Sequence, residues 1–287
     1  MKIPQYETLT LEKIVGGGQT LGTLDDGRKA FVWGGLPGES VTVRLTKKKS
    51  HFVEGVVTDI HTPSTNRIAP LDPDSYLSTS PWQIMTLEAE QHYKAALIEE
   101  AFELHDIVLP HPIDFFTDRK TTHYRNKVEF SFYGYEDDAN DYEHLKLAFF
   151  RRGGKGKVVV ESCSLLPDSM MSLALKICTY LESRQVKARR LKTLLIRCDQ
   201  EGNCVWQLYI KEPSCSYMNE ADALSFGAHG GEVIYSDPKS PASRITKSLM
   251  SIGDTTLTDT VHGIPFRYAT EGFFQVNIPV YEEALRD

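Results

Sequence analysis

The sequence predicts a small β-barrel followed by a mixed α/β domain, and three observations lead to this fold class. Residues 1–60 contain five short β-rich runs separated by turns with glycine or proline. Several runs between residues 123 and 260 alternate apolar and polar side chains, as a strand with one buried face does. A further run, beginning at Pro167, has apolar residues at helical spacing. Barrel strands are therefore expected first, and strands mixed with a helix after them.

The composition is that of a globular protein with room for two or three hydrophobic cores. The chain has 287 residues, of which 41% are hydrophobic and 25% are charged. No uninterrupted apolar run approaches the ~20 residues of a membrane-spanning helix, and residues 1–6 lack the apolar core of a signal peptide. We therefore expect a cytoplasmic monomer without a membrane partner.

The cysteines and histidines indicate neither a disulfide framework nor a metal site. The five cysteines are an odd number, lie far apart and include no C-x-x-C pair. The histidines follow no spacing that is typical of metal ligands. Free and mostly buried thiols are expected.

The barrel strands are bounded by turns, one of which is basic. The triple glycine at residues 16–18 predicts a turn rather than a phosphate loop, because neither a Lys-Ser/Thr pair nor a helix follows it. A basic hairpin tip follows the fourth run, where Lys47, Lys48 and Lys49 either contact nucleic-acid phosphates or are merely solvated. The predicted strands span residues 7–15, 20–24, 29–33, 40–46 and 52–60.

The middle of the chain begins with a linker and a helix. Residues 61–80 are rich in Pro, Ser, Thr and Asp, which is typical of a linker. An apolar stripe at helical spacing then predicts a helix from Pro81 to about Leu104. The α/β domain follows, with a helix over residues 167–182. Its strands are predicted at residues 127–135, 145–151, 157–160, 193–198, 205–210 and 232–235.

Two basic clusters in this domain are candidate phosphate-binding sites. The first is Arg125, Asn126 and Lys127, which stand where the chain enters a strand. The second is a glycine-rich turn that carries Arg151, Arg152, Lys155 and Lys157. On charge pattern alone, a solvated strand end is the simpler explanation of the first cluster, and the net charge of −7 argues against a protein that coats RNA with basic charge. The basic residues of 184–192 follow a predicted helix end and are not counted as site residues.

The C-terminal part predicts two strands, at residues 261–268 and 270–276, and a helix that begins at Pro279. The middle of this C-terminal part contains Phe273, Gln275 and Asn277. From the residues alone, these positions indicate a packed edge strand with solvated amides.

Two motifs in this order resemble the RNA uracil-5 methyltransferase family. They are Tyr-Arg-Asn-Lys-Val-Glu-Phe at residues 124–130 and Phe-Phe-Gln-Val-Asn at residues 273–277. The family modifies tRNA or 23S rRNA with S-adenosylmethionine, and it has an OB-like TRAM barrel, a central α/β domain and a Rossmann-like methyltransferase domain. The resemblance implies that Phe273, Gln275 and Asn277 lie beside the target base and the methyl donor.

The resemblance also divides the chain into regions. It implies a TRAM barrel over residues 1–60, a linker over 61–80 and a helical segment over 81–122 that packs on the methyltransferase domain. A central RNA-binding domain spans 123–260, and residues 261–287 only begin the methyltransferase domain. The nucleophilic cysteine and the base belong to that domain, so we expect this chain to hold no catalytic residue. It is expected to bind RNA without methylating it, and S-adenosylmethionine is expected to serve the full-length enzyme only.

An iron–sulfur cluster, which many family members hold, is not expected here. The equivalent stretch, residues 77–85, has no cysteine, and only Cys163 matches the downstream position. A cluster takes four ligands, so we assign Cys163 to packing. A non-catalytic RNA-binding module remains the alternative function. A radical methylthiotransferase is disfavoured because its Cys-x-x-x-Cys-x-x-Cys motif is absent.

Overall fold

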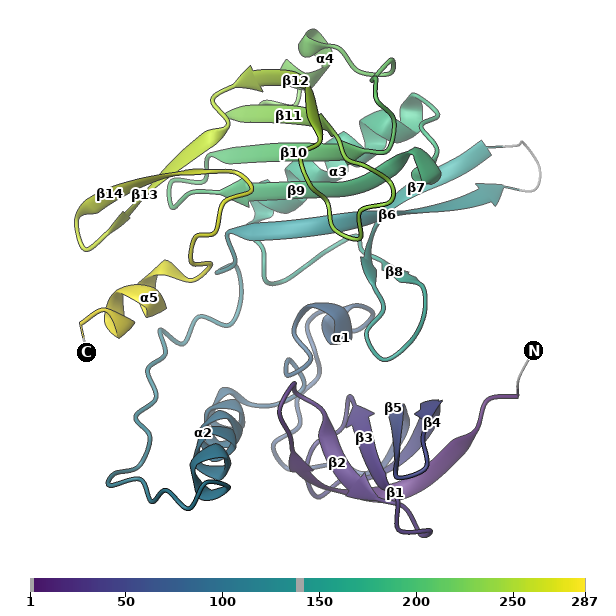
Figure 1. The fold of residues 1–287 in the computed structure, drawn as a ribbon, viewed down its shortest axis with the longest axis vertical. Helices are drawn as coiled ribbons and strands as arrows, with labels where there is room; N and C mark the ends of the chain where they lie inside the picture. Colours follow the sequence, from purple (N-terminus) through teal and green to yellow (C-terminus); the bar gives the residue numbers. More distant parts are fainter. Residues whose placement is uncertain (1–2, 138–141, 287) are drawn as a thin grey trace. The chain divides into compact units, whose positions relative to one another are not determined.

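The computed structural model describes residues 3–137 and 142–286, which form two compact units (Figure 1). The first unit comprises Met1–Phe116 and Phe150–Gly156. The second comprises Thr117–Phe149 and Lys157–Asp287. The division differs from the regions expected from the sequence, because the glycine-rich basic turn belongs with the barrel. None of the described helices is both long enough and apolar enough to cross a membrane.

The first unit contains a closed barrel of five strands, as the sequence predicts (Figure 1). Its strands are joined in the order β1-β2-β3-β5-β4, with β3 and β5 parallel. Alternate residues point inward, so that valines and leucines such as Leu11, Val32 and Val43 are buried inside it. The strands are β1 (Tyr6–Ile14), β2 (Thr20–Thr23), β3 (Lys29–Trp33), β4 (Ser40–Lys48) and β5 (Phe52–Thr62).

The predicted linker is held against this barrel. The backbone N–H of Ile68 donates to the Ile84 carbonyl at 2.9 Å, and the N–H of Thr86 donates to the Asn66 carbonyl at 3.0 Å. A short helix, α1 (Tyr76–Thr79), lies within the segment. Part of its backbone is therefore hydrogen-bonded within the fold.

The following helix begins later than the sequence predicts. The helix α2 spans Leu87–Glu103, because the Thr86 hydroxyl accepts from the Ala89 N–H and caps it. Ala89 is the one residue buried in α2, whereas apolar residues at its C-terminal end are exposed, including Leu104 and Val108. That residues 81–122 pack on another domain stays a prediction.

The second unit is built on a seven-stranded sheet of order β12-β11-β10-β9-β6-β7-β8. Its central pairs β9–β10 and β6–β9 are antiparallel, and β10 and β11 are parallel. The edge strand β12 was not predicted from the sequence. The strands are β6 (Lys127–Asp137), β7 (Tyr142–Phe150), β8 (Lys157–Val159), β9 (Leu191–Cys198), β10 (Cys204–Ile210), β11 (Gly230–Tyr235) and β12 (Lys247–Gly253).

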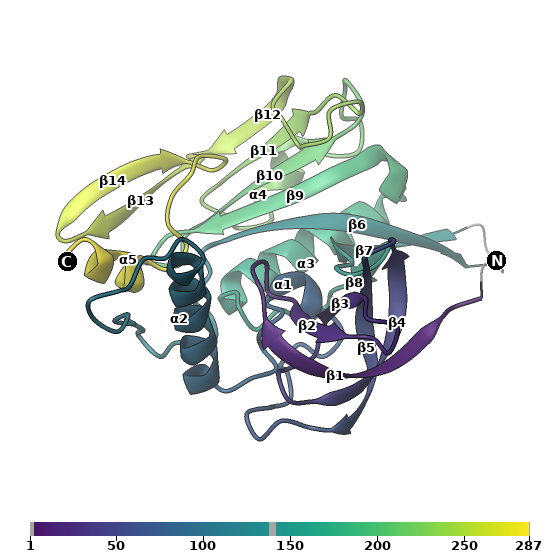
Figure 2. The ribbon, with the colours of Figure 1, turned by 60° about the horizontal axis from the view of Figure 1, so that its bottom comes forward.

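One face of this sheet is covered by the helix α3 (Asp168–Ser183) (Figures 1 and 2). The core between them includes Phe130, Ile177 and Trp206, all fully buried. Gly231 is required beneath the indole, because a Cβ there would lie 2.1 Å from Trp206 Cε2. Two short elements complete this part, η1 (Ala188–Arg190) and α4 (Glu220–Leu224).

The C-terminal part forms a hairpin and a helix. The hairpin pairs β13 (Thr256–Val261) with β14 (Ile264–Ala269), and α5 (Ile278–Ala284) follows. The predicted strand over residues 270–276 is wrong, because these residues form an irregular segment. Its carbonyl groups find donors in side chains of the large sheet, so it needs no neighbouring strand.

Candidate functional site

The two motifs that the sequence singles out meet in the second unit. Asn126 immediately precedes β6, and its side-chain amide donates to the backbone carbonyl of Gln275 at 3.0 Å. Asn126 is 8% exposed, and its Oδ1 atom has no partner among the described residues. The first motif thus helps to hold the backbone of the second, 149 residues further along the chain.

Lys127 and Arg197 stand side by side on the face of the sheet opposite α3. They are paired across β6 and β9, so their side chains point to the same side. Leu195 and Tyr209 pack together on that face, away from the main core. Lys127 is partly exposed and its Nζ lies 3.5 Å from Glu129. A partly solvated ion pair of this kind leaves the ammonium able to take another anion.

Arg125 is fixed by its backbone and not by its side chain. Its N–H donates to the Leu165 carbonyl at 3.0 Å, while its Nε atom is buried and has no partner within the described part of the chain. A guanidinium is always charged and its donors normally find acceptors. Arg125 and Lys127 therefore provide two positive charges at the entry to β6, as predicted; their role in phosphate binding stays a prediction.

The irregular segment 270–277 is held by a buried arginine. Arg197 is 1% exposed, and its Nη1 donates to the carbonyls of Gly272 at 2.6 Å and Ala269 at 3.4 Å. Its Nη2 donates to the Phe274 carbonyl at 3.3 Å. Burial lowers the pKa of Arg197, although the nearby acidic groups counteract this effect.

Aromatic packing reinforces the same segment. The Arg197 guanidinium lies 4.9 Å from the ring centre of Tyr268, which stacks on Phe274 at 4.4 Å. Tyr268 donates a short hydrogen bond to the Asp259 carboxylate. At the start of the segment, the buried Gln207 amide donates to Glu271 at 2.9 Å.

The three predicted base-proximal residues differ in their surroundings. Phe273 is 86% exposed, in contrast to its neighbour Phe274, which packs on Tyr268. Gln275 is half-buried, and Asn277 caps α5 by accepting from the Val280 N–H at 3.4 Å. The cap explains Asn277 structurally, whereas nothing in the fold explains so exposed a ring at Phe273.

The basic turn belongs to the first unit, where it packs on the barrel. The Arg152 guanidinium lies 4.9 Å from the Trp33 ring centre, and the Arg152 N–H donates to Ser78 Oγ at 3.2 Å. Gly153 has a positive φ of 67°, and a Cβ there would lie 2.6 Å from Val56. Arg151, Arg152 and Lys155 are exposed. The turn thus places basic side chains on the barrel.

Lys157 differs from the other predicted phosphate ligands. Its Nζ donates to the Phe132 carbonyl at 2.6 Å within the second unit, and burial lowers its pKa. Lys157 thus has a backbone partner in the sheet unit and is less exposed than the other basic residues of the turn, and its role in phosphate binding stays a prediction.

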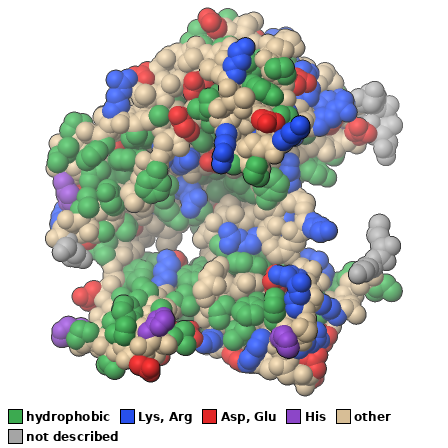
Figure 3. Space-filling view, viewed as in Figure 1, with side chains coloured by type: hydrophobic (Ala, Val, Ile, Leu, Met, Phe, Trp, Pro, Cys, Tyr) green, Lys and Arg blue, Asp and Glu red, His purple; other side chains and the backbone are tan. Residues whose placement is uncertain are grey.

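The basic hairpin tip lies between β4 and β5, as predicted, and its three lysines are exposed. Lys47 is engaged, with its Nζ 2.5 Å from Glu54 and over the ring of Phe52. Lys48 and Lys49 extend the tip. On the face that Figure 3 shows, basic side chains are scattered among acidic and apolar ones.

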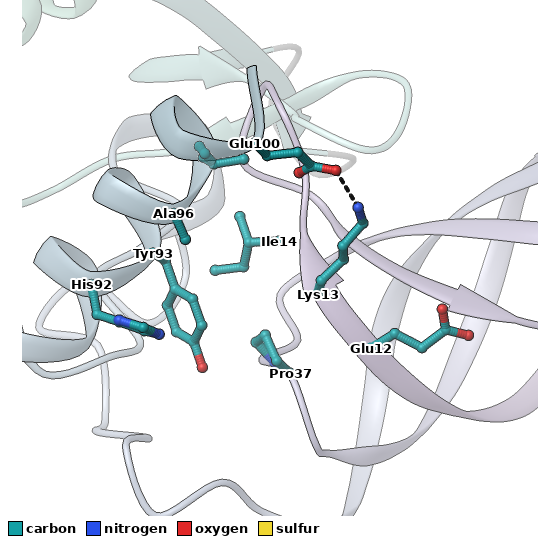
Figure 4. A pocket seen from close by; sticks show the side chains of 9 residues that line it. Glu12, Lys13, Ile14, Pro37, His92, Tyr93, Ala96 and Glu100 are labelled. Carbon is teal, nitrogen blue, oxygen red and sulfur yellow. Dashed lines mark hydrogen bonds and ion pairs between the residues drawn. The ribbon is translucent and has the colours of Figure 1, made fainter. Parts of the chain in front are cut away.

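Two of the pockets in the described part of the chain can be compared with this site. One of about 220 Å³ lies between β1 and α2, lined by Ile14, Pro37 and Tyr93, with the Lys13–Glu100 ion pair at its rim (Figure 4). It is smaller than most ligand sites, and two of its charged lining residues, Lys13 and Glu100, are already paired with each other. A more open pocket of about 510 Å³ lies beside α3, where Lys176 already donates to the carbonyls of Ser225 and Phe226.

The described residues do not fit a metal cluster or a nucleotide cradle. No group of three or more His, Cys, Asp or Glu side chains converges among them. Of the cysteines, four are buried, and burial raises the pKa of Cys178 to about 12. Turns with several glycines join two strands or lead from a helix into a strand, whereas a phosphate-binding turn leads into a helix.

Sequence reasoning missed Arg197. The signal was a single charged residue inside the apolar run of β9, which has a burial pattern of a central strand. A buried arginine needs several hydrogen-bond acceptors. Here the acceptors are backbone carbonyls of a segment without regular secondary structure.

Comparison with known proteins agrees with this arrangement. Residues 5–58 match the TRAM domain, and these residues form the barrel. The barrel is therefore similar to a TRAM domain.

The sequence is similar to RNA methyltransferases. An uncharacterized RNA methyltransferase of Thermotoga maritima is 27% identical over 56% of this chain and 35% of that protein. The 23S rRNA (uracil(1939)-C(5))-methyltransferase RlmD of Shewanella halifaxensis is 27% identical over 52% of this chain and 33% of that protein. The matched part thus spans about a third of the length of these curated relatives.

The fold is also found in a solved methyltransferase. The tRNA (uracil-54, C5)-methyltransferase of Pyrococcus abyssi, in complex with S-adenosyl-L-homocysteine, superposes with a TM-score of 0.70 and 13% identity. The match covers 97% of this chain and 63% of that one. Because nearly all of this chain shares the fold, the match does not support the expectation that a methyltransferase domain is missing.

Proposed function

We propose that this chain binds RNA for C5 methylation of a uridine in rRNA or tRNA. The observation that carries the proposal is the meeting of the two motifs, in which Asn126 holds the backbone at Gln275 beside Lys127 and Arg197. Support comes from the TRAM domain and from the relatives, of which RlmD is named for 23S rRNA uracil C5 methylation. We keep the cytoplasm as the proposed compartment.

The roles of the residues follow from their charge and exposure. Arg125 and Lys127 are proposed to bind phosphates on the sheet unit, and Arg151, Arg152 and Lys155 on the barrel unit, with the lysines at 47–49 in support. Phe273 is proposed to stack on a base, because its ring is exposed on a segment that is otherwise anchored. Gln275 is the proposed amide partner of that base.

S-adenosylmethionine is the proposed methyl donor of the enzyme, since the solved neighbour holds S-adenosyl-L-homocysteine. We further propose that the chain alone binds RNA without methylating it. A nucleophile must reach C6 of the uracil, and a thiol must lose its proton to attack. Burial raises the pKa of Cys178, and the hydrogen bond with Cys204 raises that of Cys198. The same hydrogen bond lowers the pKa of Cys204 to about 7, but the Cys204 side chain is buried, as is that of Cys163. A non-catalytic RNA-binding module is the second candidate function.

The RNA-binding proposal is tested with Arg125→Ala and Lys127→Ala in a salt series. Affinity for a tRNA transcript and for an rRNA fragment is measured for each variant, after the unfolding midpoint has shown that the fold is kept. Each lost phosphate contact should weaken binding to both RNAs alike and reduce the slope of log K against log salt by about one. Lys239→Ala, an exposed lysine in a loop, is the matched control.

Two outcomes separate the alternatives. Unchanged affinity and slope in both variants would show that the cluster is a solvated strand end. Calorimetric titration with S-adenosylhomocysteine, together with transfer of a labelled methyl group, distinguishes an active enzyme from a binding module. A saturable site and label on C5 of a uridine would refute the proposal that the chain alone is inactive.

A further inference from the structure

The exposed ring of Phe273 belongs to a backbone segment that hydrogen bonds from the Arg197 and Asn126 side chains fix in place. Residues 270–277 have no regular secondary structure, so their carbonyls lack ladder partners. Arg197 supplies donors to Ala269, Gly272 and Phe274, and Asn126 supplies one to Gln275. The carbonyls on both sides of Phe273 are therefore fixed by side chains of the sheet.

The use of a buried arginine for this purpose is informative. Among the described residues Arg197 forms no ion pair within 4 Å, and its guanidinium contacts backbone carbonyls and the Tyr268 ring. Burying a charge without a paired carboxylate is costly, and an apolar side chain could fill the same space. A guanidinium, however, offers five donors in a fixed plane, which suits several carbonyls of one turning backbone.

Phe273 and Phe274 differ in their contacts with the neighbouring aromatic residues. Phe274 stacks on Tyr268, which the Arg197 guanidinium also contacts, so this ring is used as an anchor. Phe273 is left pointing to solvent, and an exposed ring on a rigid backbone loses little entropy on stacking. A ring on a flexible segment would lose more conformational entropy when it stacks.

We propose that Arg197 and Asn126 are positioning residues that fix the backbone at Gly272–Gln275, so that the Phe273 ring is presented to a base of single-stranded RNA. The inference rests on the RNA-binding function proposed above. It assigns to Asn126 a role through Gln275 rather than a phosphate contact, and it assigns to Arg197 a role that does not depend on touching RNA.

A double-mutant cycle tests this coupling. The probe is a fluorescent oligouridine strand, and the proteins are the full chain with Phe273→Ala, Arg197→Met and the two combined. Loss of one stacked base should weaken binding roughly tenfold in Phe273→Ala. Arg197→Met should cause a similar loss in the wild type, and little further loss when Phe273 is already alanine. Phe273→Tyr, which keeps the ring, should bind like the wild type.

Controls keep a loss of folding apart from a loss of position. Arg267→Met changes an exposed arginine of β14 and should leave affinity unchanged. If Arg197→Met does not fold, Asn126→Ala releases the Gln275 carbonyl and takes its place in the cycle. Hydrogen exchange should quicken over residues 270–277 in either variant, and remain slow in β9 and β10.

The outcomes also separate this inference from the proposed function. Additive losses in the cycle, or no loss in Phe273→Ala while binding stays salt-dependent, would overturn the positioning role and leave RNA binding in place. Absence of binding to oligouridine, tRNA and rRNA alike would overturn both.

Discussion

Arg67 and Glu39 form a two-point ion pair in the barrel unit. Arg67 Nε donates to Glu39 Oε1 at 2.6 Å and Arg67 Nη2 donates to Glu39 Oε2 at 2.8 Å. The carboxylate is fully buried and also accepts from the N–H groups of Leu36 and Ser64. The pair joins the loop before β4 to the segment that follows the barrel. Burial alone would raise the pKa of Glu39, but these hydrogen bonds lower it overall.

We expect Glu39→Gln to lower the free energy of unfolding by about 3 kcal/mol at neutral pH, because it leaves Arg67 without its counter-charge. Since the folded pKa of Glu39 lies below its unfolded value, the stabilisation is complete above the unfolded pKa and is lost as the pH falls through the folded pKa. The difference between wild type and variant should therefore shrink below about pH 4. Urea unfolding over a pH series measures this difference in the free energy of unfolding.

The control is Glu54→Gln, in an exposed pair with Lys47, which should change stability by less than about 1 kcal/mol. A difference that is independent of pH would contradict this account of Glu39.

Gly231→Ala should destabilise the sheet unit by about 1–3 kcal/mol, because the added methyl group meets the buried Trp206 ring. Tryptophan fluorescence during urea unfolding reports the change. Gly16→Ala, where a Cβ would meet no atom within 4 Å, is the matched control and should stay within about 0.5 kcal/mol. Equal stability of the two variants would show that the strand moves to accommodate the methyl group.

Lys155→Ala and Lys157→Ala should have different effects, although the two lysines are close in sequence. Lys155 is exposed, so its loss should reduce the salt slope of RNA binding by about one without affecting folding. Lys157 donates to the Phe132 carbonyl, and its loss should lower stability by about 1 kcal/mol with the slope unchanged. The same salt series and unfolding curves measure both. A reduced slope in Lys157→Ala would restore it to the phosphate-binding set.

Anaerobic incubation with ferrous iron and sulfide should leave the protein without visible absorbance after desalting. A cluster needs four ligands, whereas Cys198 and Cys204 form only a pair across β9 and β10, and no group of three or more His, Cys, Asp or Glu side chains converges among the described residues. Burial also raises the pKa of Cys178 to about 12. Cys163→Ser should behave like the wild type. A brown product whose colour depends on Cys163 would show that this thiol binds iron.

The barrel could be predicted closely because its signals are local. Alternating valines and leucines define the strands, and Gly16–Gly18 and Gly38 mark turns at which the backbone must reverse. The edge strand β12 was missed since most of its side chains are exposed, so it shows no buried alternation.

The candidate site could be predicted only in part. Motif resemblance located both Asn126 and Gln275, but the bond between them depends on tertiary structure. The segment 270–276 has the composition of a strand, and yet Arg197 replaces the missing neighbour with side-chain donors. The position of the basic turn likewise depends on the packing of Arg152 on Trp33, which no local pattern encodes.

The barrel unit is discontinuous in sequence, because Phe150–Gly156 belongs to it while the flanking strands belong to the sheet unit. The chain therefore passes between the units three times, after residues 116, 149 and 156. A fragment that ends at Phe116 would lack Arg152 and Gly153 and would bare the indole of Trp33. Exchange of TRAM barrels between such proteins consequently requires that the barrel and this distant seven-residue turn be transplanted together.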